Sequence, residues 1–270
     1  MYSKKITFLF TVVLTTLFSL SNYAGISILN GLTHIHKTEK GQTIEGEIII
    51  QNMDKESSEL LIISLKDLMI FCKKESSFID FGAHDRSLGK WITFNTKERI
   101  LKPNENFILK YTINIPEHME EEIIDLGTFW GVIMVETSNL IKENDIIGLT
   151  VNTKFRYAVQ IITHVGEFIN PEIEFLDIAY AKTKELEANI NITIQNKGDY
   201  MVQPSLILEL FNAAGENVKQ TQATYKKVYP KKCADFSIQI SNLPKGVYDG
   251  VLIADYGGDM AGANISITID

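Results

Sequence analysis

Short segments in which polar and apolar residues alternate recur along most of this chain, and they restrict it to an all-β fold. In Asn106–Ile115 (NFILKYTINI), every second residue from Phe107 onward is apolar, and Ala188–Gln195 (ANINITIQ) repeats the pattern with three isoleucines. Successive side chains of a β-strand point to opposite faces, so this period of two is typical of half-buried strands. No long segment with a period of 3.6 residues competes with it, which excludes helical and α/β folds.

The expected strands form two series. The first comprises Gly25–Leu29, Thr43–Gln51, Glu59–Phe71, Phe78–Phe81, Lys90–Phe94, Asn106–Ile115, Phe129–Thr137 and Leu149–Thr163. The second comprises Ile173–Ala179, Ala188–Gln195, Ser205–Phe211, Gln220–Val228, Asp235–Ile240, Gly250–Ala254 and Asn264–Ile269. Turn-forming pairs such as Asn30-Gly31 and Pro103-Asn104 separate these segments.

Two sets of seven or eight short strands predict two tandem immunoglobulin-like β-sandwich domains. A length of 270 residues is sufficient for both. We place the first domain at residues 25–168 and the second at 171–270, with the hinge near Gly166–Pro171.

The first 24 residues are typical of a cleaved secretory signal peptide. Lys4 and Lys5 precede the apolar run Ile6–Leu20, and Ala24 supplies a small residue for cleavage. The run is shorter than the roughly 20 residues that a membrane-spanning helix needs. No later segment approaches 18 consecutive apolar residues, so we expect an exported protein, periplasmic or on the cell surface, with no integral membrane span in the mature chain.

Charge and cysteine content exclude several classes of protein. The formal net charge is −8, with 26 basic and 34 acidic residues and no basic cluster, which argues against a nucleic-acid partner. Two cysteines are too few for a disulfide-dense scaffold or a Cys-rich zinc module. An oxidising compartment would permit a bridge between Cys72 and Cys233, but their expected positions in different domains favour two separate thiols.

No catalytic or cofactor motif is present. The chain lacks a Gly-x-Ser-x-Gly elbow, a His-Glu-x-x-His run and a phosphate-binding glycine loop. His34 and His36 would share a face of a strand as two metal ligands might, but the spacing of the other histidines supplies no third ligand. We therefore expect a non-enzymatic protein without metal or cofactor.

The first domain resembles the N-terminal domain of PapD-like periplasmic chaperones. The resemblance rests on Gly25–Leu29, Gly41-Gln42-Thr43, Leu101–Glu105 (LKPNE), Gly127–Glu136 (GTFWGVIMVE) and Asn152–Tyr157 (NTKFRY). The same features are similar to the first domain of WxL-interacting cell-surface proteins, whose second domain is similar to the region with Gln195–Gly198 and Leu243–Tyr248.

The resemblance implies a site for another protein's terminus. In the chaperones, a basic pair in the cleft between the domains captures the client's C-terminal carboxylate. Arg156 matches one position, with Lys154 on the same face, while His34 lies near the other, where no arginine stands. Lys154 and Arg156 also fit the solvated face of an ordinary half-buried strand.

We expect the protein to hold another exported or surface protein, such as a pilus or adhesin subunit, by β-strand addition. An edge strand at Leu149–Thr163 would offer unpaired backbone groups, with Phe155, Tyr157 and Val159 as an apolar face for the partner. Chaperone and surface-accessory roles both remain open. The alternative is a cell-envelope module for carbohydrate or peptidoglycan, with Trp91 as the aromatic residue that stacks on a sugar.

Overall fold

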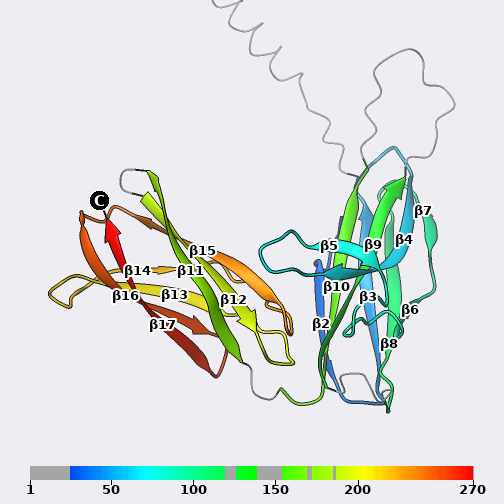
Figure 1. Cartoon of the computed structure of the whole chain (residues 1–270). Helices are drawn as coiled ribbons and strands as arrows, with labels where there is room; N and C mark the ends of the chain where they lie inside the picture. The colour runs from blue at the N-terminus through cyan, green and yellow to red at the C-terminus, as the bar shows by residue number, and fades with distance from the viewer. Residues whose placement is uncertain (1–24, 119–125, 139–153, 169–171, 185–186, 270) are drawn as a thin grey trace, which may run out of the picture.

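The structure, a computed structural model, describes residues 25–118, 126–138, 154–168, 172–184 and 187–269. The expected signal peptide and the start of the expected strand Leu149–Thr163 lie outside these residues. The described part contains β-strands and no helix, as expected, and therefore no helix capable of crossing a membrane. The strands form two β-sandwiches (Figure 1).

The first sandwich has two sheets. One orders β1 (Ile26–Ile28), β3 (Thr43–Asn52), β8 (Asn106–Asn114) and β6 (Ile92–Phe94). The other orders β2 (Thr33–Thr38), β10 (Arg156–Val165), β9 (Gly127–Ser138), β4 (Glu59–Met69) and β5 (Ser77–Asp80), with β7 (Glu98–Leu101) also paired to β4. The chain therefore changes sheet between β1 and β2, and β2 runs parallel to β10.

The second sandwich packs a sheet of β11 (Ile173–Lys184), β12 (Glu187–Asn196) and β15 (Cys233–Ser241) against a larger sheet. The larger sheet orders β14 (Asn217–Gln222), β13 (Ser205–Phe211), β16 (Gly246–Asp255) and β17 (Met260–Ile269). The immunoglobulin-like architecture is thus confirmed. Because residues 169–171 are not described, the boundary between 168 and 171 stays a prediction.

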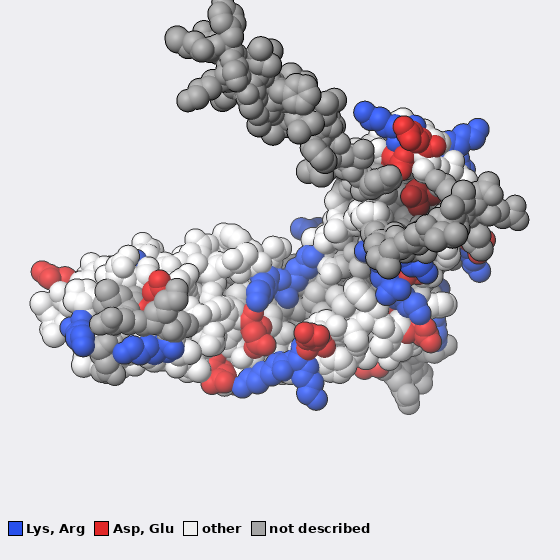
Figure 2. All heavy atoms as spheres, turned by 90° about the horizontal axis from the view of Figure 1, so that it is seen from above, with Lys and Arg blue, Asp and Glu red and all other residues white. Residues whose placement is uncertain are grey.

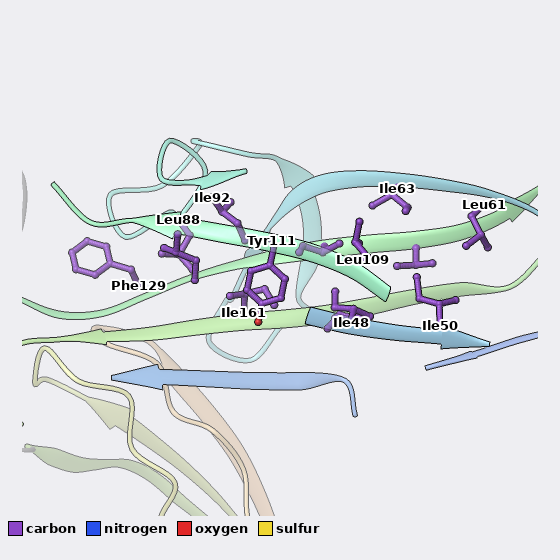
Figure 3. Packing of buried hydrophobic residues seen from close by; sticks show 14 of the residues in the cluster. Ile48, Ile50, Leu61, Ile63, Leu88, Ile92, Leu109, Tyr111, Phe129 and Ile161 are labelled. Carbon is purple, nitrogen blue, oxygen red and sulfur yellow. The ribbon is translucent and has the colours of Figure 1, made fainter. Parts of the chain in front are cut away.

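Alternation explains why most of these segments form strands. Along β8, Leu109, Tyr111 and Ile113 are buried while the intervening residues are more exposed. Figure 3 shows Leu109 and Tyr111 packed between the sheets. The strand β9 differs, because every residue from Gly127 to Val135 is buried. One face of β9 packs in the core, and the other contacts Met201 and Tyr229 of the second sandwich as well as Leu68 of the first. The strand β9 therefore contributes to the contact between the two domains.

The strand β2 was not among the strands expected from the sequence. Its alternate residues His34, His36 and Thr38 face the interior where most strands place apolar side chains. Pairing with β10 rather than local apolar periodicity therefore defines this strand.

Candidate functional site

The candidate site lies on the outer face and open edge of β10, beside the contact between the two sandwiches. The contact centres on Trp130, Val132 and Ile162 of the first sandwich, which pack against Met201 and Tyr229 of the second. The rings of Trp130 and Tyr229 lie 4.8 Å apart. Burial of these large side chains supplies the hydrophobic part of the interdomain contact.

Polar bonds fix the relative position of the sandwiches. Arg86 Nη2 donates to Asp199 Oδ1 at 2.6 Å, and the Arg86 side chain is only 4% exposed. The Met201 amide donates to Thr128 Oγ1 at 2.7 Å, and the Tyr200 hydroxyl donates to the Val165 carbonyl at 2.9 Å. Figure 2 shows basic and acidic side chains side by side where the sandwiches meet.

A disulfide between Cys72 and Cys233 also joins the sandwiches, with the two Cα atoms 5.0 Å apart. The expectation of two separate thiols is therefore wrong. The loop after β4 carries Cys72 across to the start of β15, and Lys73 beside it pairs with Asp177 of β11 at 2.7 Å. Sequence separation concealed the contact, because only the docking of the two sandwiches brings the cysteines together.

The edge of β10 is half covered. All ten residues of β10 pair with β9, but β2 pairs only with Gln160–Val165. The Gln160 amide donates to the Leu32 carbonyl on the β2 side at 2.9 Å. Because backbone groups alternate sides along a strand, the N–H and C=O groups of Arg156 and Ala158 point to the same side. There, no described strand pairs with them.

The apolar residues expected to face a partner point inward instead. Val159 is completely buried in the core of the first sandwich, and Phe155 and Tyr157 are half-buried against the same core. The Tyr157 hydroxyl donates to the Ile26 carbonyl at 2.7 Å. The expectation is wrong for Val159, which a partner cannot reach, while the half-buried rings of Phe155 and Tyr157 remain partly accessible at the edge.

The expected basic residues do not converge on one point. Arg156 is paired with Glu136 across the strand pair, and its side chain is 66% exposed. Lys154 is exposed just before β10 begins. His34 faces the interior, where its Nδ1 lies 3.0 Å from the Tyr111 hydroxyl. His34 and Arg156 therefore already have partners in this arrangement.

A lysine of the second sandwich stands at the end of the open edge instead. Lys227 Nζ donates to Thr33 Oγ1 at 2.8 Å and to Gln160 Oε1 at 2.9 Å. Among the described residues, no carboxylate lies within ion-pair distance of it, and burial lowers the pKa of its ammonium group. The sequence offered no signal for this residue. Lys227 and Gln160 are 67 positions apart in the chain, and only the docking of the two sandwiches brings them into contact.

Trp91, the residue expected to bind a sugar, packs mainly against other residues of the first sandwich. Trp91 packs against the core of the first sandwich, and its ring centroid lies 4.6 Å from that of Phe129. This position gives Trp91 a structural role and offers no support for stacking on a sugar.

Ser87, His84 and Asp67 lie together and have the composition of a catalytic triad, but the serine contacts the aspartate rather than the histidine. The Ser87 hydroxyl donates to buried Asp67 at 2.8 Å, whereas His84 Nε2 lies 3.8 Å from the same carboxylate and stacks on Trp130. A nucleophilic serine would instead need the histidine as its base. Within the described residues, no three His, Cys, Asp or Glu side chains gather to hold a metal ion.

Comparison with known proteins gives structural similarities only. No family model matches the chain, and no curated protein matches it. Its structure is similar to a chain from the chaperone–tip adhesin complex of CFA/I fimbriae biogenesis, at 12% identity and a TM-score of 0.47, covering 91% of this chain and 98% of that one. The structure is also similar to the class 5 fimbriae chaperone CfaA, at 14% identity and a TM-score of 0.47. That match covers 90% of this chain and 98% of CfaA.

The E. coli chaperone DraB gives 11% identity and a TM-score of 0.43, covering 89% of this chain and 98% of that one. Each of these three chains is similar to this one in fold alone, at an identity of 14% or below.

Proposed function

We propose that this protein is an exported, chaperone-like binding protein that holds another exported protein by β-strand addition to the open edge of β10. The observation that carries the proposal is the half-covered edge of β10: β9 pairs with the whole strand on one side, whereas on the other side β2 pairs only with Gln160–Val165, and no described strand pairs with Arg156–Val159 there. Unpaired edges are templates for another strand, and here domain docking places Lys227 of the second sandwich beside the open edge.

The edge favours a strand that runs parallel to β10. The strand β2 is itself parallel to β10 and begins at Thr33, and the chain before it turns away toward β3. A client strand in line with β2 would extend the same sheet and end near Leu32 and Thr33. Its backbone would bond to Arg156 and Ala158, each bond contributing about 0.5–1.5 kcal/mol.

Lys227 suits the end of such a strand. Its ammonium group contacts Thr33, the residue at which the added strand would stop. It has two neutral acceptors and no carboxylate among its described neighbours. A client's C-terminal carboxylate would supply the missing negative charge, and a hydrogen bond to a charged group is worth about 1.5–3 kcal/mol.

The interdomain bridge supports export. A disulfide between Cys72 and Cys233 persists in oxidising compartments and is rare in reducing ones. An exported client would meet this protein in the same compartment.

The edge is tested first with Ala158→Pro. The Ala158 amide points to the open side, so proline removes a donor to the client without removing a bond to β9. The matched control is Gln220→Pro in β14, an edge strand of the second sandwich, where the Ala223–Leu206 bond shows that the Gln220 amide also points outward. Thermal melts verify that both variants are folded.

Each protein is used to capture partners from an envelope extract, which are identified by mass spectrometry. We expect an exported protein retained by wild type and Gln220→Pro but lost with Ala158→Pro. If Ala158→Pro captures the same proteins, strand addition at β10 is wrong.

The carboxylate is tested with the captured protein's C-terminal peptide, prepared with a free carboxylate and with an amide. Lys227→Gln should weaken the free acid about 10-fold or more and leave the amide nearly unchanged, while Lys226→Gln should affect neither. Lys226 is the control because it is exposed and its ammonium group donates to the Asp235 carbonyl. Equal losses for the acid and the amide would show that Lys227 does not bind the carboxylate.

A further inference from the structure

Three metal-binding atoms converge on the inner side of β2. His34 Nδ1 lies 3.0 Å from the Tyr111 hydroxyl, and His36 Nε2 lies 2.9 Å from the same oxygen. The two histidines are two residues apart on one strand, so both reach the tyrosine from the same face. The sequence could not show the third donor, because Tyr111 belongs to β8 in the opposite sheet.

The fold holds the tyrosine in this position. Tyr111 is 1% exposed, and its ring stands between the sheets with the oxygen at the end toward β2 (Figure 3). Its cross-strand neighbour on β3 is Gly46, where a β-carbon would overlap the ring. The glycine therefore gives the ring the space it needs to present its hydroxyl to both imidazoles.

We propose that His34 Nδ1, His36 Nε2 and Tyr111 Oη form a site for a late first-row divalent metal ion, with Cu(II) as the preferred ion. Imidazole nitrogen is a ligand for copper, zinc and nickel, and Cu(II) binds most tightly in this series. The proposal is independent of strand addition at β10.

The donor set favours copper among these ions. Tetragonal ligation by nitrogen and oxygen is typical of Cu(II), whereas structural Zn(II) sites are tetrahedral and usually contain cysteine. The separations of 2.9 and 3.0 Å are hydrogen-bond distances, so the preference rests on the ligand types and on the order of affinities.

Binding of the metal ion releases one proton from the protein. The ion takes the place of the phenolic proton of Tyr111, which passes to solvent, and bonds form to the phenolate oxygen and to two neutral imidazole nitrogens. Both histidines are only half-buried, which leaves a route from solvent.

The test is titration of the untagged protein with Cu(II), followed by calorimetry and visible absorption. We expect one high-affinity ion per chain and a phenolate-to-copper charge-transfer band. His36→Gln should weaken binding at least about 100-fold, since even residues behind the ligands change affinity 10–100-fold. Tyr111→Phe should abolish the band and weaken binding while preserving the shape of the core.

His118→Gln is the control, because His118 is an exposed imidazole outside the cluster. It should leave affinity and spectrum unchanged. Weak binding that is equal in all variants, or a band that survives Tyr111→Phe, would overturn the proposal. Zn(II) competing as strongly as Cu(II) would refute the preference for copper. If Tyr111→Phe lowers the melting temperature, His36→Gln, which changes only a half-buried side chain, still decides the outcome.

Discussion

The disulfide that joins the two sandwiches should contribute a large share of the protein's stability. Replacing Cys72 and Cys233 together by serine removes a cross-link that spans 161 residues. In the chain-entropy description, a loop of this length restricts the unfolded chain by about 5 kcal/mol at 25 °C, which is an upper value for the loss. Native contacts such as Arg86–Asp199 remain, so the folded structure should persist.

The assay is urea denaturation followed by tryptophan fluorescence and far-UV circular dichroism. Trp130 lies in the interdomain contact against Tyr229 and reports separation of the sandwiches. Without the bridge, we expect the fluorescence transition to move to lower urea and to precede the loss of strand structure. Wild type in reducing agent is the second sample, because it separates loss of the bridge from loss of packing at buried Cys233.

Two results would refute this reasoning. Thiol titration of the native, unreduced protein should find no reactive cysteine even after unfolding in urea, and two titratable thiols would show that the bridge is absent. An unchanged urea midpoint in the double serine variant would show that the bridge does not restrict the unfolded chain.

Three further substitutions concern the contact between the sandwiches. Asp199→Asn leaves the buried Arg86 guanidinium without its ion-pair partner and should lower the free energy of unfolding in urea by about 3 kcal/mol. Asp177→Asn breaks the exposed pair with Lys73 and should lower it by less than about 1 kcal/mol. Burial lowers the pKa of His164 from 6.5 to about 4, so the unfolded chain takes up a proton first and stability should fall as pH drops from about 6.5 toward 4. His164→Gln should flatten that part of the stability profile, and an identical pH profile in the variant would assign the loss to other groups.

Local pattern was sufficient for most of the architecture. Alternation in segments such as Asn106–Ile115 predicted strands because period-two burial is a property of each strand by itself. The same reasoning predicted the two sandwiches and the segment containing β10. It failed for β2, whose inward residues are His34, His36 and Thr38, since a polar inner face carries no apolar signal.

The candidate sites depended on contacts that no local pattern records. The sequence brought attention to Lys154, Arg156 and the apolar residues near them, but only the sheet pairing shows that Val159 is buried and that the edge beside Ala158 is open. Strand pairing and domain docking join residues far apart in the chain. Side-chain alternation along the chain therefore determined most of the strands, whereas the packing of sheets and domains decided the bridge at Cys72, the place of Lys227 and the convergence of two histidines on Tyr111.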